Sequence, residues 1–125
     1  MGTKNEKNGR ILVVEDDHAT RNHLKTMLND EGYDVLEARH GLEALQQLST
    51  DPEVDMIFLD LMMPVMSGWR LHRALQAHPV LGRVPVVLLS HNTVHEASDA
   101  LDVQGIISKP IQDADVLNTV KELAR

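Results

Sequence analysis

The feature that most constrains the fold of this chain is an alternation between short apolar runs and stretches with helical periodicity. The apolar runs are rich in β-branched and aliphatic residues, which is typical of strands buried on both faces. Strands that alternate with helices form a parallel sheet with helices on both faces, so the sequence predicts an α/β fold of three layers. The five expected strands are residues 11–14, 33–38, 56–59, 84–89 and 105–108.

Five amphipathic stretches lie between and after these runs. We expect helices over about 18–30, from 41 to the breakers at 49–52, from 67–68 onward, over about 94–103, and from about 112. The side chains expected to face inward are Thr20, Leu24, Met27, Leu28, Leu42, Leu45, Leu48, Leu71, Ala74, Leu75, Val116, Leu117, Val120, Leu123 and Ala124. With no internal repeat, the pattern predicts one domain over 10–125, preceded by a polar, disordered lead-in at 1–9.

The composition disfavours several classes of function. Among the 125 residues, 12 are Lys or Arg and 19 are Asp or Glu, so the formal charge of −7 disfavours binding to nucleic acid or an anionic membrane. The chain has no cysteine, which excludes disulfides and thiolate chemistry. No apolar run approaches the roughly 18 residues of a membrane span, and the N-terminal segment lacks the apolar centre of a signal peptide. We therefore expect a cytoplasmic protein with no direct nucleic-acid or membrane contact.

Polar side chains gather where the predicted strands end. The acidic triplet 15–17 follows the first strand, Asp60 ends the third, Ser90 ends the fourth and Lys109 follows the fifth. Because the carboxyl ends of parallel strands meet at one edge of the sheet, these side chains are expected to converge in one cleft. Crowded carboxylates repel one another unless a cation neutralises them, and Mg²⁺ prefers oxygen ligands of this kind.

The same residue types suit phosphoryl transfer to a carboxylate. A carboxylate held beside a hard cation can attack phosphorus and give an aspartyl phosphate. A metal ion, a lysine ammonium and a serine hydroxyl are suitable partners for the negative charge on the phosphoryl oxygens. The residues taken singly also allow simpler interpretations, in which the acidic triplet is a solvated helix N-cap and Ser90 is a turn residue.

The order and spacing of these motifs resemble the receiver domain of two-component response regulators, over about residues 10–125. The motifs are Ile11-Leu12-Val13-Val14-Glu15-Asp16-Asp17, Asp60-Leu61-Met62-Met63-Pro64, Met66-Ser67-Gly68, Leu88-Leu89-Ser90 and Lys109-Pro110. The resemblance implies a doubly wound sheet of five parallel strands in the flavodoxin-like order 2-1-3-4-5. Periodicity alone leaves that order undecided.

The resemblance also implies a metal site and a phosphoacceptor. Asp60 matches the residue that is phosphorylated in this family. Glu15 and Asp16 match the acidic pair that helps to hold Mg²⁺, directly or through water. Asp60 and the backbone carbonyl of Met62 would complete the protein ligands.

Three further positions follow from the same resemblance. Ser90 matches the switch hydroxyl and Lys109 matches the family's lysine. The peptide bond between Lys109 and Pro110 is a candidate for the cis form. Asp17 falls one position beyond the acidic pair, so we expect it to cap the following helix.

Several positions depart from the family pattern or carry weaker signals. Ile106 stands where an aromatic residue is usual, which excludes the familiar aromatic swing coupled to the switch hydroxyl. His91 stands where a small residue is usual, and we hypothesise that it alters access of the phosphodonor or the rate of dephosphorylation. The spacing of His91 and His95 could indicate zinc, but a third clear ligand is absent and exposed side chains are the better interpretation. We expect Trp69 to be partly buried and to report metal binding through its fluorescence.

The expected function is therefore that of a phosphoacceptor, which takes a phosphoryl group from a histidine kinase or a histidine phosphotransfer protein onto Asp60 with Mg²⁺. Phosphorylation would switch binding to a downstream output protein or domain, so the chain is a signalling domain that catalyses only its own phosphorylation and dephosphorylation. Ile106 and His91 motivate the alternative of a pseudo-receiver that binds partners without phosphorylation. A metal-dependent phosphatase fits poorly, because Met62 stands where such enzymes need a second acid. The sequence leaves open the cognate kinase, the output and whether two copies form a homodimer.

Overall fold

The computed structural model describes residues 9–51, 53–61, 67–90 and 103–123, without the side chain of Trp69. Its strands are β1 (Gly9–Val14), β2 (Tyr33–Ala38), β3 (Met56–Asp60), β4 (Val86–Ser90) and β5 (Gly105–Ser108). Its helices are α1 (His18–Asp30), α2 (Gly41–Thr50), α3 (Gly68–Gln76), the 3₁₀ helix η2 (Leu81–Arg83) and α5 (Asp113–Leu123). The helix expected over about 94–103 lies outside the described residues except at its last position, 103, which is not helical. The expected burial of Trp69 and the expected inward position of Ala124 also lie outside the described residues.

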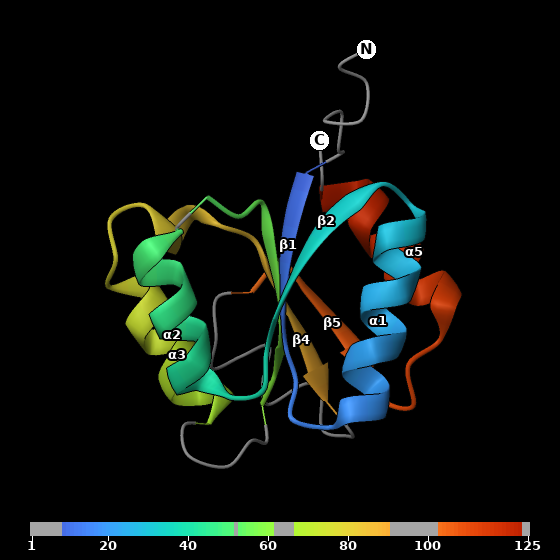
Figure 1. Cartoon of the computed structure of the whole chain (residues 1–125), viewed down its shortest axis with the longest axis horizontal. Helices are drawn as coiled ribbons and strands as arrows, with labels where there is room; N and C mark the ends of the chain where they lie inside the picture. The colour runs from blue at the N-terminus through green and yellow to red at the C-terminus, as the bar shows by residue number, and fades with distance from the viewer. Residues whose placement is uncertain (1–8, 52, 62–66, 91–102, 124–125) are drawn as a thin grey trace.

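The five strands form one parallel sheet in the order β2-β1-β3-β4-β5, so the flavodoxin-like order is confirmed. Ile11 in β1 pairs with Val35 in β2 on one side and with Met56 in β3 on the other. Figure 1 shows α2 and α3 on one face of the sheet and α1 and α5 on the opposite face. The predicted three-layer α/β fold is therefore confirmed, and the carboxyl ends of all five strands share one edge.

Successive side chains along each strand enter two different cores, as the pleat of a strand requires. In β1, Leu12 and Val14 join the core beneath α2 and α3, whereas Ile11 and Val13 join the core beneath α1 and α5. Every residue of β3 is buried, so this central strand contributes to both cores. The helices add Ala44, Leu48, Leu71 and Leu75 to the first core and Leu24, Leu28, Val116 and Val120 to the second.

Two expected inward positions on the helices are wrong. Leu42 is 44% exposed because the buried face of α2 runs through Gly41, Ala44 and Leu48, and Leu42 lies one position off that face. Ala74 in α3 is exposed. The side chain of His72 is buried on that helix instead, at 4% exposure. None of the helices in the described ranges is long and apolar enough to cross a membrane.

The strand expected over 84–89 begins later, at Val86. The N–H of Val84 donates to the carbonyl of Leu81 at 3.1 Å and closes the η2 turn. Pro85 has no N–H to contribute to a strand ladder, although its carbonyl accepts from the N–H of Ile57 at 3.0 Å. The strand expected over 11–14 begins two residues earlier, at Gly9, the last residue of the expected lead-in.

Candidate functional site

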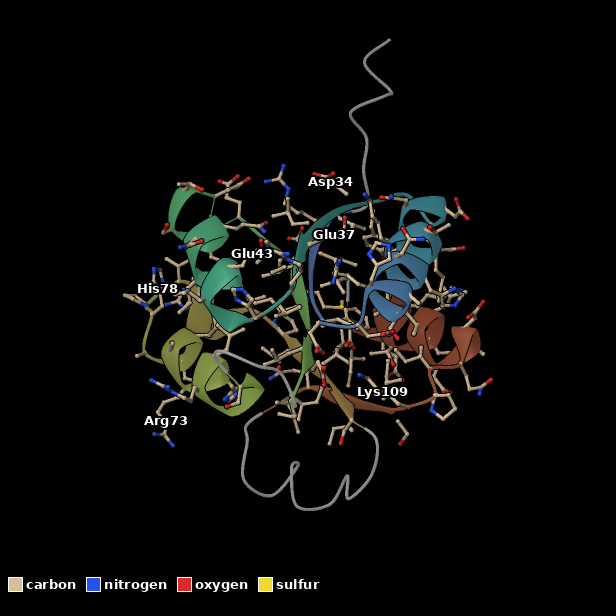
Figure 2. The ribbon with its side chains drawn as sticks, turned by 60° about the horizontal axis from the view of Figure 1, so that its bottom comes forward. Asp34, Glu37, Glu43, Arg73, His78 and Lys109 are labelled. Atoms are coloured by element: carbon tan, nitrogen blue, oxygen red, sulfur yellow. The ribbon has the colours of Figure 1, made fainter. Side chains whose placement is uncertain are left out.

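Acidic and basic side chains meet at the carboxyl edge of the sheet, which Figure 2 turns toward the viewer with Lys109 in the lower half. Glu15 follows β1, Asp60 ends β3 and Lys109 follows β5. These residues line a cavity of about 610 Å³. The other lining residues are Asp16, Asp17, Ala19, Thr20, His23, Pro110 and Ile111. The structure thus brings together side chains that the sequence placed at the ends of three separate strands.

The start of α1 holds the acidic triplet in place. Asp17 is the N-cap of this helix, and its carboxylate accepts from the backbone N–H of Thr20 at 2.9 Å and from the Thr20 hydroxyl at 2.6 Å. The hydroxyl hydrogen bond is the main reason that the pKa of Asp17 lies below its usual value. The capping role predicted for Asp17 is confirmed, which leaves Glu15 and Asp16 as the acids available to the cavity.

A close approach between β3 and α3 places the start of the helix beside Asp60. The backbone N–H of Gly68 donates to the carbonyl of Leu61 at 3.0 Å. A Cβ atom at position 68 would lie 2.7 Å from the Cα of Leu61, so only glycine allows this approach. Ser67, just before it, caps α3 by accepting from the N–H of Arg70 at 3.3 Å. The Ser67-Gly68 pair therefore fixes the start of α3 directly against the strand that ends in Asp60.

Lys109 links the two buried acids. Its Nζ lies 2.8 Å from Oε1 of Glu15 and 3.5 Å from Oδ2 of Asp60. Burial of the amine opposes its charged form, but the hydrogen bond and charge of Glu15, followed by those of Asp60, outweigh burial and raise the pKa of Lys109 above its usual value. The peptide bond between Lys109 and Pro110 is cis, as expected. The ammonium is thus held charged between the carboxylates.

The fourth strand brings Ser90 to the same edge. Ser90 ends β4, which lies between β3 and β5, and its carbonyl accepts from the N–H of Lys109 at 2.8 Å. Ser90 does not line the cavity itself. Met62, whose carbonyl was an expected metal ligand, lies outside the described residues, as do His91 and His95.

A divalent cation fits the donor set at this edge. Glu15, Asp16 and Asp60 each offer a carboxylate oxygen, and these atoms lie within 4.8 Å of one another. Oε1 of Glu15 is buried and, apart from its ion pair with Lys109, has no hydrogen-bond partner in the described part of the chain. Among the described residues that line the cavity, Lys109 is the one lysine or arginine, and Asp17 brings the number of lining carboxylates to four. An all-oxygen site with excess negative charge suits Mg²⁺.

Arg21 is a part of this region that the sequence analysis missed. Its side chain is buried at 8% exposure, and Nη1 donates to the carbonyl oxygen of Glu15 at 2.8 Å. A signal was present, because Arg21 shares the spacing of Leu24 and Leu28 on the buried face of α1. An arginine on an apolar helix face implies a buried acceptor, since an unpaired buried charge is costly.

Ile106 stands where, by the resemblance to receiver domains noted from the sequence, an aromatic residue is usual. It lies in β5 opposite Leu88 and packs, partly buried, against the core beneath α2 and α3. An aliphatic side chain in this place extends the core and has no ring to reorient. Ile106 is therefore a core contact in this structure.

Comparisons with known proteins agree on one family. The family described as the response regulator receiver domain matches residues 11–121. Over 122 residues the chain is 34% identical to the response regulator MprA of Mycobacterium ulcerans, a match that covers 93% of this chain and 50% of that protein. The chain thus spans about half the length of the curated relatives it matches.

Solved structures give the same result. The chain is similar to the signal receiver domain of a signal transduction histidine kinase from Syntrophus aciditrophicus, with a TM-score of 0.83 and 35% identity over 93% of this chain and 89% of that one. It also shares its fold with the receiver domain of the sensor histidine kinase PA1611 from Pseudomonas aeruginosa PAO1, with a TM-score of 0.84 and 24% identity over 93% and 97% of the two chains. That structure has a magnesium ion coordinated in its active site cleft.

Proposed function

Because this chain belongs to the response regulator receiver domain family of two-component systems, we propose that it accepts a phosphoryl group on Asp60 in a Mg²⁺-dependent reaction. The observation that carries the proposal is the buried cluster at the carboxyl edge of the sheet. There the Lys109 ammonium lies 2.8 Å from Glu15 and 3.5 Å from Asp60, in a cavity that Asp60 itself lines. A carboxylate in such a place has both a path to a donor and a cation beside it.

The proposed nucleophile is the ionised carboxylate of Asp60. One of its oxygens attacks the phosphorus of a phosphohistidine and forms a new O–P bond. The P–N bond to the donor imidazole breaks, its electron pair returns to the ring nitrogen, and that nitrogen takes up a proton. The product on this chain is an aspartyl phosphate, which water can later hydrolyse to restore the carboxylate.

Two side chains are proposed to stabilise the phosphoryl oxygens. The Lys109 ammonium already lies beside Asp60 and can donate to an oxygen of the transferred group. Ser90 ends the neighbouring strand β4 and supplies a hydroxyl from that side. The ammonium and the hydroxyl would donate their strongest hydrogen bonds to the oxygens on which the negative charge of the phosphoryl group develops.

The proposed metal ligands are Glu15 and Asp16, directly or through water, with Asp60 and the backbone carbonyl of Met62. The closeness of the three carboxylates supports the proposal that these side chains are ligands. When bound, Mg²⁺ would offset the charge of these carboxylates and of the incoming phosphoryl oxygens. Glu15, held by Lys109, would keep one ligand oxygen buried at the base of the cavity.

The proposed phosphodonor is a histidine kinase or a histidine phosphotransfer protein. Receiver domains pair with histidine kinases and with output domains, and the relatives found here include a response regulator and a histidine kinase's own receiver. Phosphorylation is proposed to shift a pre-existing conformational equilibrium and so change binding to an output partner. With Ile106 in β5, that shift would proceed through a smaller rearrangement after Ser90 than an aromatic swing.

The test is intact-mass spectrometry after incubation with acetyl phosphate and Mg²⁺. We expect a gain of one phosphoryl group, and we expect chelation of the metal or the Asp60→Asn change to abolish it. Asp55→Asn is the matched control, because Asp55 lies just before β3 at the opposite edge and accepts from the N–H of Arg10. This control should gain the phosphoryl group as the unchanged chain does.

The same assay is then repeated with phosphorylated histidine kinases as donors. A chain that gains no phosphoryl group from either kind of donor would be a pseudo-receiver, and the proposed function would be wrong. Phosphorylation that survives Asp60→Asn would instead place the acceptor elsewhere.

A further inference from the structure

We propose that Arg21 is a positioning residue for the metal site, because its buried guanidinium holds the peptide unit that joins Glu15 to Asp16. The proposal rests on the metal site of the proposed function and extends it to a residue outside the cavity. Arg21 does not line the cavity, and it acts through the backbone of the two acids.

The contact between Arg21 and the site is direct and buried. Nη1 of Arg21 donates to the carbonyl oxygen of Glu15 at 2.8 Å, and the arginine is only 8% exposed. The N–H of the same residue, Glu15, donates to the carbonyl of Ala38 in β2 at 3.0 Å. Glu15 therefore has its backbone held on both sides, by β2 through its N–H and by α1 through its carbonyl.

The guanidinium is itself anchored to the neighbouring strand. Nε of Arg21 donates to Oε1 of Glu37 at 3.3 Å, and Glu37 precedes Ala38 in β2. Figure 2 labels Glu37 near the centre of the view, between α2 and α1. The contacts close a ring from β1 through α1 to β2 and back to β1. Within this closed set of hydrogen bonds, the peptide unit between Glu15 and Asp16 has little freedom to rotate.

Asp16 depends on this ring more than Glu15 does. The carboxylate of Glu15 is buried and held by Lys109 at 2.8 Å and by the N–H of Asp17, which donates to Oε2 at 3.1 Å. Asp16 is exposed, and its carboxylate makes no hydrogen bond or ion pair with any described residue. The place of Asp16 is therefore determined by the peptide unit before it, which is the unit that Arg21 holds.

Simple electrostatics predicts the opposite effect for the loss of this arginine. A guanidinium near the acids repels a divalent cation, so its removal would by charge alone tighten Mg²⁺ binding. Positioning predicts weaker binding, because the second proposed ligand loses its fixed place. Lys25 provides a matched control, since its Nζ lies 3.0 Å from the other oxygen of Glu37 and donates nothing to Glu15.

The experiment titrates MgCl₂ into unphosphorylated protein by isothermal titration calorimetry, with the fold of each variant checked by circular dichroism. Arg21→Gln is expected to weaken Mg²⁺ binding about 10-fold, as for other residues that orient metal ligands. Arg21→Lys keeps the charge but not the forked donor, so its affinity should fall between those of Arg21→Gln and the unchanged chain. Lys25→Gln should bind Mg²⁺ at least as tightly as the unchanged chain.

The outcomes separate this proposal from the proposed function. A folded Arg21→Gln variant that binds Mg²⁺ as tightly as the unchanged chain, or more tightly, would overturn the positioning role. If Arg21→Gln does not fold, an unchanged affinity in Arg21→Lys overturns it equally, and failure of both variants to fold makes Arg21 a folding residue only. An unchanged chain that binds no Mg²⁺ would overturn the metal site and this inference with it, whereas normal Mg²⁺ binding without phosphorylation would remove only the phosphoacceptor function.

Discussion

At each edge of the parallel sheet a basic side chain forms ion pairs with carboxylates from other elements, and the two clusters differ chiefly in burial. At the amino edge, Arg10 in β1 forms ion pairs with Asp34 and Asp51, and its backbone N–H donates to Asp55 at 2.7 Å. The side chains of Arg10, Asp34 and Asp51 are 33%, 44% and 43% exposed. Figure 2 shows Asp34 at the top of the view, at the opposite end from Lys109.

The cluster at the carboxyl edge lies in a different environment. Lys109 forms ion pairs with Glu15 and Asp60, and the side chains of Lys109, Glu15 and Asp60 are only 10%, 0% and 5% exposed. Asp16, the third acid of the carboxylate group, is exposed. Water stabilises exposed carboxylates well, so the excess negative charge at the amino edge requires no bound ion. Buried carboxylates lack that solvation, so excess negative charge at the carboxyl edge favours a cation. Burial, rather than the number of acids, distinguishes the candidate site from the ion-pair cluster around Arg10.

The largest difference between the edges should appear in phosphorylation. Lys109→Gln is expected to slow phosphorylation by acetyl phosphate about 100-fold, because it removes a preorganised donor to the phosphoryl oxygens. Arg10→Gln should leave the rate unchanged, since Arg10 contacts only the amino edge. Time courses of intact mass with Mg²⁺ measure both rates. Equal slowing in the two variants would mean that the sheet responds to overall charge and would break the comparison.

Each edge also has a glycine whose replacement tests how rigid the edge is. Gly68→Ala is expected to lower the free energy of unfolding by about 2 to 3 kcal/mol, because its Cβ would meet the backbone of Leu61 and Asp60. Gly9→Ala should cost about 1 kcal/mol, since φ of +148° strains a side chain but the nearest atom belongs to the movable Asp55 carboxylate. Urea denaturation measures both costs. A larger cost for Gly9→Ala would reverse the order of rigidity inferred for the two edges.

Removal of one acid should change stability in opposite directions at the two edges. Without Mg²⁺ at neutral pH, Asp60→Asn is expected to raise the free energy of unfolding by about 1 kcal/mol, because one of the buried, mutually repelling carboxylates is lost while Lys109 keeps Glu15. Asp34→Asn should lower it by less than about 1 kcal/mol, as expected for an exposed ion pair.

Urea denaturation with chelator and then with MgCl₂ measures these changes. The metal should stabilise the unchanged chain and the Asp34→Asn variant, since ligands that bind only the folded state shift its stability. It should stabilise Asp60→Asn much less. A loss of stability in Asp60→Asn with chelator present would show that the carboxyl edge is a structural cluster like the amino one.

The smallest effect concerns an acid at the carboxyl edge but outside the cavity. The pKa of Glu43 lies below its usual value, mainly because the backbone N–H of Arg39 donates to its carboxylate at 2.6 Å. A lowered pKa in the folded state gives stability that is present above the usual glutamate value of 4.5 and is lost as pH falls through the folded pKa. Glu43→Gln should therefore cost less than about 1 kcal/mol at neutral pH and almost nothing in acid.

Chemical denaturation at several pH values measures this difference between Glu43→Gln and the unchanged chain. A cost that is independent of pH would indicate packing rather than charge. If Glu43→Gln lowers the free energy of unfolding as much as Gly68→Ala does, then a location at the carboxyl edge affects stability more than burial does.

Local sequence predicted most of the elements and several parts of the site. The apolar run before Asp60 predicted β3 because a strand buried on both faces must be apolar throughout. The Asp17 cap was predicted from the family resemblance, and the hydrogen bond that confirms it is local, since its partner is only three residues away. Predictions failed where neighbours in space decide exposure. Leu42 has the apolar character of an inward residue, but the angle at which α2 packs leaves it 44% exposed.

The contribution of Arg21 shows the same limit. Its spacing on α1 marked a buried position, but its acceptor, the carbonyl of Glu15, lies on the backbone and has no sequence signature. The late start of β4 was also open to sequence reasoning only in part. The missing N–H of Pro85 is a local feature of the sequence. The closing hydrogen bond from Val84 to Leu81 instead depends on how η2 packs against α3.

The sequence by itself determined which segments become strands and which polar residues lie at or just after the ends of β1, β3, β4 and β5, because apolar periodicity and chain breakers act over a few residues. Only the tertiary structure decided that β1 lies beside β3 and that Lys109 reaches both Glu15 and Asp60. Strand order depends on contacts between distant segments, which no local pattern records. The burial that makes these carboxylates favour a cation arises from the same contacts. The residue types therefore determined the chemistry of the site, and the fold determined how strongly its carboxylates favour a cation.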